Sequence, residues 1–226
     1  MIATVLLDVD GTLVASNGAH ASAWSDAFAE AGVSRSREAI LPLIGLGGKD
    51  MLRRAADLGD ETEPGKTIAR RRKEIFAERY AATLRPTPGA RDLLLYLRER
   101  GVACVVASAA QPEELERLLD AAGVADLIDD SSTSGDADAG KPAPDILTAA
   151  LKKAGTDAAD AVMLGDTPYD VEAAGRVPMR AIGLLCGGWS ASELAPAAVF
   201  ADPGDLLARI AESPLREIEE GRKTSR

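Results

Sequence analysis

Residues 2–13, Ile-Ala-Thr-Val-Leu-Leu-Asp-Val-Asp-Gly-Thr-Leu, decide the fold of this chain. Five of the first six of these residues are apolar, and polar residues follow at once. A short apolar run that ends in a turn signal predicts a buried strand, most often a central strand of a parallel sheet. Asp8 and Asp10 come directly after the run, and Gly11 indicates a turn. In open α/β sheets ligands bind outside the carboxyl ends of the strands, so we expect both carboxylates in one crevice. Capping of a turn would explain one of these aspartates, but it explains two poorly.

The length and composition are typical of a globular protein, and acidic residues outnumber basic ones. The chain has 226 residues, of which 46% are hydrophobic and 27% are charged, and its formal net charge is −10. This length accommodates one large domain, or a core with a smaller insert. The negative charge argues against nucleic acid and anionic membranes as partners, because both require a basic surface. It does not exclude an anionic substrate, because a metal ion or a lysine can reverse the field inside a cleft.

Targeting signals and cysteine usage indicate the compartment. No apolar stretch reaches the ~18 residues of a membrane span, and the first residues lack the basic segment of a signal peptide. Cys104 and Cys186 do not have the spacing of metal ligands, and Cys104 lies in an apolar run that resembles a strand. We therefore expect a cytoplasmic protein in which both thiols are reduced.

The segment after the first strand has a helical pattern without a convincing strand. Apolar residues recur at helical spacing, and glycines separate the expected helices, which cover residues 19–31, 36–44, 49–58 and 63–84. The basic run Arg70-Arg71-Arg72-Lys73 is interpreted as a solvated helix face, with phosphate recruitment as the alternative. Arg70 stands one helical turn before Glu74, which suits an ion pair. This segment is predicted to be a helical insert.

From Pro86 onward, expected strands and helices alternate. The strands are expected at 102–107, 126–130, 161–165 and 180–185, and the helices at 89–100, 112–122, 144–154 and from Thr167-Pro168. Ser190 to Glu193 form a capping-box pattern. Repeated strand–helix units predict an α/β fold with a doubly wound parallel sheet. We expect a catalytic core of residues 1–14 and 86–212, a helical domain of residues 15–85, and a tail of residues 213–226 that forms a surface helix or frays.

Each later core strand is followed by a residue that suits a phosphate site. Ser108 follows one strand, Lys141 precedes a helix, and Asp166 and Asp170 follow a third strand. Singly, each has a simpler explanation, as a helix cap or as a solvated loop residue. Together, in a parallel sheet, they would converge with Asp8 on one edge.

Such a cluster of carboxylates requires positive charge. Two unit charges ~4 Å apart interact by about 4 kcal/mol at an effective dielectric constant of 20. Lys141 supplies one positive charge, and Mg²⁺ suits oxygen ligands better than Zn²⁺, which would favour a group of Cys and His residues. Neighbouring carboxylates are expected to raise the pKa of Asp10, as a general acid requires.

The stretch Asp8-Val-Asp10-Gly-Thr12, together with Ser108, Lys141-Pro142 and Gly165-Asp166, resembles the motifs of the haloacid dehalogenase superfamily of phosphohydrolases. The resemblance covers residues 1–14 and 86–210 and implies a Rossmann-like core. It implies that Asp8 is the nucleophile and Asp10 the acid and base, and that Ser108, Lys141 and Thr12 bind phosphoryl oxygens. Mg²⁺ would be held by Asp8, Asp166 and the backbone carbonyl of Asp10, with Asp170 supporting it directly or through water.

The helical insert resembles the cap of the phosphoglycolate phosphatase and β-phosphoglucomutase branch of that superfamily. Such caps close over the site and contact the substrate. His20 and Lys49 are the candidate specificity residues of the cap, although an exposed helix position and an ordinary loop explain them as well. The presence of Asp10 favours phosphate chemistry over dehalogenation.

The function expected from these residues is Mg²⁺-dependent hydrolysis of a small phosphorylated metabolite through an aspartyl-phosphate on Asp8. A sugar-phosphate mutase is the nearest alternative. A phosphonatase, a non-enzymatic phospho-acceptor module of the response-regulator type and a catalytically silent interaction protein are further alternatives. A monomer or a homodimer is expected.

Overall fold

The structure is a computed structural model, and it describes residues 2–218. Within these residues, a six-stranded parallel sheet has the order β3-β2-β1-β4-β5-β6. β1 pairs with both β2 and β4, so the predicted central strand is confirmed. The strands are β1 (Thr4–Leu7), β2 (Ala103–Ala107), β3 (Asp130–Ser132), β4 (Ala161–Gly165), β5 (Arg180–Leu184) and β6 (Ala198–Phe200).

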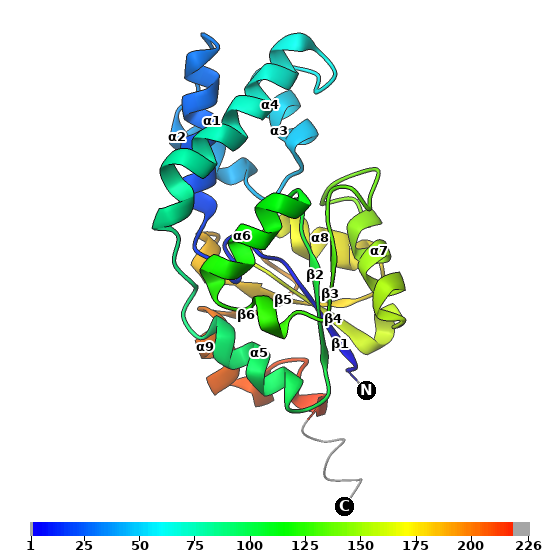
Figure 1. Cartoon of the computed structure of the whole chain (residues 1–226). Coiled ribbons are helices and arrows are strands. Elements are labelled where there is room, and N and C mark those ends of the chain that lie inside the picture. Colours follow the sequence, from blue (N-terminus) through cyan, green and yellow to red (C-terminus); the bar gives the residue numbers. More distant parts are fainter. Residues whose placement is uncertain (1, 219–226) are drawn as a thin grey trace, which may run out of the picture.

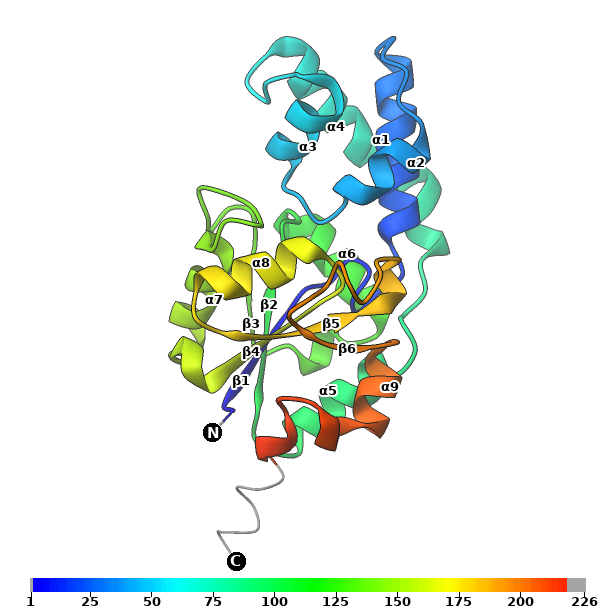
Figure 2. The ribbon, with the colours of Figure 1, turned by 180° about the vertical axis from the view of Figure 1, so that it is seen from behind.

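Helices cover both faces of the sheet, which confirms the doubly wound α/β fold (Figures 1 and 2). One face carries α5 (Ala90–Arg98), α6 (Pro112–Ala122) and α9 (Pro203–Ala208), and the other carries α7 (Asp145–Ala154) and α8 (Pro168–Arg176). Val5 and Leu7 pack into the apolar core of the first face, whereas Leu6 packs into that of the second. Because successive side chains of a strand point to opposite faces, an apolar run without alternation produces a strand that is buried on both sides.

The segment between β1 and α5 forms a layer of helices beyond the sheet edge at which β1 ends (Figure 1). The helix α1 packs against α4 there. The layer contains α1 (Asn17–Glu30), α2 (Arg37–Ile40), the 3₁₀ turn η1 (Leu41–Leu43), α3 (Gly48–Ala56) and α4 (Glu63–Ile75). The helix expected over residues 63–84 changes its hydrogen-bonding pattern after Ile75, first to the π-turn η2 (Phe76–Tyr80) and then to the 3₁₀ turn η3 (Ala81–Thr83).

The two ends of this helical segment lie side by side. Val14 and Pro86 form an isolated antiparallel bridge, and the Ala15 N–H donates to the Arg85 carbonyl at 2.9 Å. The chain therefore leaves the sheet and returns to it at one place. That residues 15–85 form a domain distinct from the core stays a prediction.

Several local predictions differ from the structure. The strand expected near 126–130 begins only at Asp130, because the 3₁₀ turn η4 (Ala125–Leu127) precedes it. Ser190 and Glu193 form one of the two bonds of a capping box, in which the Ser190 N–H donates to Glu193 Oε2 at 2.9 Å. The Glu193 N–H donates to the Ser190 carbonyl and not to its hydroxyl, and a turn follows instead of a helix. The short elements β6 and α9 were not predicted, since three and six residues are too few to show a period.

The end of the described chain packs against the core. Ser213 and Leu215 are fully buried, and Ile218 is nearly so. The expected frayed tail is therefore wrong for residues 213–218, where a helical turn begins at residue 216 with Ile218 buried and Arg216 exposed. Residues 219–226 lie outside the described part. Cys104 is buried in the core, as predicted. Among the described residues, every helix is too short or too polar to cross a bilayer.

Candidate active site

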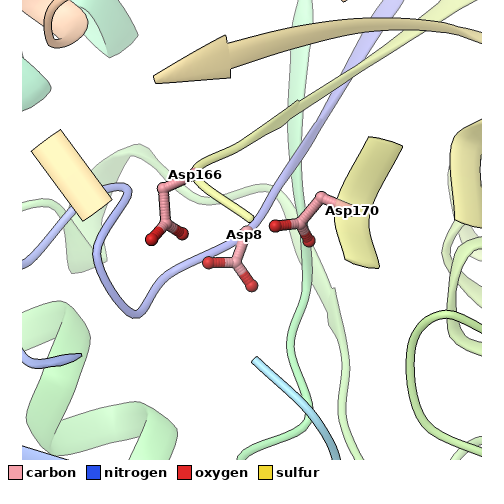
Figure 3. A group of neighbouring side chains, drawn as sticks. All are labelled: Asp8, Asp166 and Asp170. Atoms are coloured by element: carbon pink, nitrogen blue, oxygen red, sulfur yellow. The ribbon is translucent and has the colours of Figure 1, made fainter. Parts of the chain in front are cut away.

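Three aspartates converge where β1 and β4 end (Figure 3). Asp8 follows β1, Asp166 follows β4, and Asp170 lies in the first turn of α8. All three are buried, and each offers a carboxylate oxygen within 4.8 Å of the others. The neighbouring parallel strands bring Asp8 and Asp166 together, as expected for the carboxyl edge of such a sheet.

Lys141 links two of these carboxylates. Its Nζ donates to Asp8 Oδ1 at 2.6 Å and to Asp170 Oδ1 at 2.7 Å. The side chain is 1% exposed, which contradicts the interpretation as a solvated loop residue. Burial alone would lower the pKa of Lys141, but the charges of Asp170 and Asp8 raise it above its ordinary value. Lys141 therefore carries its charge into the interior.

One ammonium group does not balance this cluster, since three ionised carboxylates would leave two negative charges. Burial, followed by the charges of Asp170 and Asp10, raises the pKa of Asp8 to about 7 despite the opposing charge of Lys141. The pKa of Asp166 is raised by burial and by the charges of Asp8 and Asp170. Buried oxygen donors with two excess negative charges fit a hard divalent cation, such as Mg²⁺.

Further side chains hold the cluster in place. The hydroxyl of Thr12 lies 3.2 Å from Asp8 Oδ2 and 3.1 Å from Asp166 Oδ1, and its single proton serves one carboxylate at a time. The Thr12 N–H donates to the Val9 carbonyl. Both donors of Thr12 are used within the protein here, and its expected contact with phosphate stays a prediction. Asn17 Nδ2 donates to Asp166 Oδ2 at 2.8 Å.

Two glycines, Gly11 and Gly187, pack closely against the side chain of Asp166. Gly11 has a φ of +80°, and a Cβ there would lie 2.2 Å from Asp166 Oδ2. A Cβ on Gly187 would lie 1.9 Å from the same atom. The sequence indicated a turn at Gly11, but the close approach to Asp166 is an additional reason for glycine at that position.

Asp10 is not a member of this group of three clustered carboxylates and has partners of its own. Its Oδ1 accepts hydrogen bonds from His20 Nε2 at 2.7 Å and from the hydroxyl of Ser16. Burial would raise the pKa of Asp10, but the charge and hydrogen bond of His20, with the Ser16 hydroxyl, lower it below its ordinary value. The predicted rise in this pKa is wrong, because the ionisable group bonded to Asp10 is a histidine and not a carboxylate.

His20 is buried, with 4% exposure, and its ring stacks on that of Phe76 with the centroids 4.1 Å apart. The interpretation of His20 as an exposed helix residue is therefore wrong. His20 lines a chamber of about 50 Å³ together with Asp8, Asp10 and Ser108. Ser108 is also buried, and its Oγ accepts the Ala110 N–H at 3.1 Å.

A second cavity, of about 580 Å³, adjoins this chamber. The two cavities share the lining residues Trp24, Gly48, Arg72, Ala109 and Glu114. Lys49 is exposed and lines the larger cavity, but not the chamber of Asp8. The room for a leaving group is therefore in the larger cavity.

Four side chains of this region were not among the predicted site residues. Ser16 and Asn17 stand where a helix begins, and such residues are ordinarily explained as caps. Arg72 belongs to the basic run interpreted as solvated, although Arg70 does pair with Glu74 at 2.6 Å, as predicted. Glu114 lies in the first turn of α6, where acidic residues favour the helix dipole.

Comparison with known proteins places this geometry in a family. The sequence matches the family model of haloacid dehalogenase-like hydrolases over residues 2–177. The phosphoglycolate phosphatase of Rhodospirillum rubrum is 32% identical over 213 residues, which cover 89% of this chain and 88% of that protein. The solved structure of a putative β-phosphoglucomutase from Bacteroides vulgatus has a TM-score of 0.82 at 25% identity and covers 96% of this chain and 90% of its own.

A plant protein is similar over a segment. Protein Suppressor of Quenching 1, chloroplastic, from Arabidopsis thaliana is 32% identical over 187 residues. The match covers 81% of this chain, which spans only 18% of that protein. Together, the fold, the carboxylate edge and these matches define a class, the α/β hydrolytic enzymes that act on phosphate esters. The chain belongs to the haloacid dehalogenase-like hydrolases, as an enzyme of their phosphatase type.

Proposed function

We propose that the chain hydrolyses a small phosphorylated metabolite in a Mg²⁺-dependent reaction that passes through a phosphorylated Asp8. The main support is the contact of Asp8 with Lys141 inside the buried carboxylate cluster. Phosphoryl transfer depends mostly on positioning and on neutralisation of charge. This cluster supplies both around a single carboxylate.

In this proposal, an oxygen of Asp8 attacks phosphorus, and the bond from phosphorus to the leaving oxygen breaks. Lys141 and Ser108 bind the phosphoryl oxygens, and Thr12 orients Asp8 through its hydroxyl. Mg²⁺, held by Asp8, Asp166, the carbonyl of Asp10 and Asp170, would screen Asp8 from the substrate dianion. Water then attacks the aspartyl-phosphate, releases phosphate and restores Asp8.

Asp10 serves as the acid and base of these steps. It gives a proton to the leaving oxygen in the first step and takes a proton from water in the second. A lowered pKa keeps Asp10 ionised, as the second role requires, although it also makes the carboxylate a weaker base. For the first role Asp10 needs a proton donor, and His20 Nε2 lies 2.7 Å from its carboxylate. His20 is therefore proposed as a positioning and proton-supplying partner of Asp10.

The mutase remains the second candidate. It is favoured by the similarity to the putative β-phosphoglucomutase and by the presence of His20 in the chamber. A phosphonatase would need a lysine of the helical layer beside Asp8, and Lys49 does not line that chamber. The match to a hydrolase family leaves the phospho-acceptor and silent-protein alternatives without support. The cytoplasmic location, the monomer or homodimer, and the absence of nucleic-acid and membrane partners stay predictions.

A phosphate-release screen over several dozen phosphorylated metabolites and an aryl phosphate, with and without Mg²⁺, tests the proposal. We expect release that requires Mg²⁺. Conversion of a sugar phosphate into its isomer without net release would replace the phosphatase by the mutase. No turnover of any compound, including the aryl phosphate, would overturn the proposal.

A further inference from the structure

Arg72 stands at the junction of the two cavities. It lies in α4 of the helical layer and lines both the chamber of Asp8 and the larger cavity. Its side chain is only 15% exposed, and its guanidinium carbon lies 5.2 Å from the ring centroid of Trp24. The proposed reaction gives no role to this arginine.

Glu114 faces Arg72 from the opposite side. It comes from α6 of the sheet region, is 12% exposed, and lines the same two cavities. Nη1 of Arg72 lies 2.9 Å and 2.8 Å from the two carboxylate oxygens of Glu114. The two side chains therefore form a neutral pair across the entrance to the chamber.

Glu114 uses only Nη1 of Arg72, so the other guanidinium N–H groups are not bonded to it. Arg72 Nε is buried and has no hydrogen-bond partner among the described residues. A buried polar group without a partner is costly, and such a group in a cavity wall indicates a ligand atom or water that completes it. Arg72 and Glu114 both line the cavities, so the guanidinium N–H groups that Glu114 does not use and the carboxylate itself can serve as donors and acceptor toward a leaving group.

We propose that Arg72 and Glu114 select the leaving group, and that it is a polyol with hydroxyls and without a second negative charge. The inference rests on the phosphatase function proposed above. A hydroxyl can accept from Arg72 and donate to Glu114 at the same time. A carboxylate or a second phosphate would find Arg72 already neutralised and would face the charge of Glu114.

The larger cavity agrees with this preference. Its wall mixes the basic residues Lys49, Arg53 and Lys73 with the acidic residues Asp50, Asp60 and Asp138. Arg53 and Asp50 pair with each other. A mixed wall does not concentrate anions as a basic one would. The volume of about 580 Å³ also exceeds the needs of a two-carbon leaving group.

Two matched substrates test the preference without a variant. Sorbitol 6-phosphate and 6-phosphogluconate differ only in the terminal group, which is CH₂OH in the first and a carboxylate in the second. We expect kcat/KM for sorbitol 6-phosphate, whose leaving group is uncharged, to be higher by about tenfold or more. The carboxylate of 6-phosphogluconate would face the charge of Glu114, and like charges at a desolvated site are strongly disfavoured. Equal values, or a preference for the carboxylate, would overturn the inference.

Glu114→Gln tests the pair itself. It leaves the charge of Arg72 uncompensated, so we expect the ratio of the two kcat/KM values to shift toward 6-phosphogluconate by about tenfold. Glu113→Gln changes the exposed neighbour on the same helix and is expected to keep the wild-type ratio. An unchanged ratio in Glu114→Gln would make the pair merely structural and would end the proposal.

Hydrolysis of p-nitrophenyl phosphate by the wild type distinguishes a failure of the leaving-group preference from a failure of the proposed phosphatase function. If this compound is hydrolysed but the polyol preference is missing, the leaving-group inference fails while the phosphatase stands. If it is not hydrolysed in the presence of Mg²⁺, the proposed function fails, and the inference fails with it.

Discussion

Asp8 and Asp10 are separated by one residue, but their carboxylates belong to two regions of the molecule. Asp8 lies among Asp166, Asp170 and Lys141, all of which come from the ends or connections of the parallel sheet. Asp10 lies against Ser16 and His20, at the beginning of the helical layer. The first environment raises the pKa of its aspartate, and the second lowers it.

The difference indicates that the two proposed catalytic roles, acceptance of phosphorus and transfer of protons, depend on different parts of the structure. The group proposed to accept phosphorus follows a strand that is buried on both faces, and its own partners, Thr12 and Lys141, lie outside the helical layer. The group proposed to move protons is completed by α1, so its state depends on where that layer lies. The comparison predicts different consequences for substitutions at the two aspartates.

The largest effect is expected for Asp8→Asn. An amide cannot act as the carboxylate nucleophile, so phosphate release should fall by about 10³-fold or more. Release is measured with the aryl phosphate at saturating Mg²⁺, and circular dichroism shows that the variant is folded. A variant with wild-type turnover would refute the role of Asp8.

Asp10→Asn should lower turnover by about 10²- to 10⁴-fold, as removal of a general acid and base does. Because the carboxylate of Asp10 is bonded to His20 and is not one of the three clustered carboxylates, Mg²⁺ binding should remain largely intact. Asp166→Asn provides the contrast, since it removes one of the clustered carboxylates and should weaken Mg²⁺ binding. Titration calorimetry measures the Mg²⁺ affinity of both variants. Equal losses of affinity would show that Asp10 and the carboxylate cluster do not differ in their role in Mg²⁺ binding.

A smaller effect is expected for His20→Gln. The variant loses the charge that lowers the pKa of Asp10, so that pKa should rise. Asp10 then stays protonated up to a higher pH, so the acid limb of the kcat profile should move upward, with the loss of turnover greatest on the acid side of the optimum. Thermal unfolding is the control for a packing defect at Phe76. A pH profile that keeps its shape would show that His20 acts through packing alone.

The smallest effect is expected for Tyr169→Phe. The Tyr169 hydroxyl of α8 donates to the Pro42 carbonyl of the helical layer at 2.8 Å, far from Asp10 in the sequence. Its loss should destabilise the fold by about 1 kcal/mol or less and lower Tm by about 2–4 °C at most. Turnover should stay within about twofold of wild type, because such substitutions away from the site are mild. A tenfold loss of turnover would show that the hydrogen bond from Tyr169 to Pro42 contributes to catalysis, as the contact of His20 with Asp10 is proposed to do.

The sheet region was largely predictable, and the reason is physical. Long apolar runs define its central strands, and the carboxyl ends of parallel strands must meet, so Asp8, Lys141 and Asp166 could be assigned together. The surroundings of Asp10 could not be derived in this way. They depend on how helices pack, and neither the partner of His20 nor the burial of Arg72 follows from helical spacing. Ser16 and Asn17 were missed because the same residue types serve as ordinary helix caps.

The bridge between Val14 and Pro86 has a consequence for how such enzymes diversify. Because the inserted helices are attached at a single pair of neighbouring backbone positions, their length and packing can change without moving a strand of the sheet. Such a change would have to keep Asn17 and His20, because these residues of the insert contact Asp166 and Asp10. The reaction would then be inherited from one ancestor while the choice of compound is acquired from another.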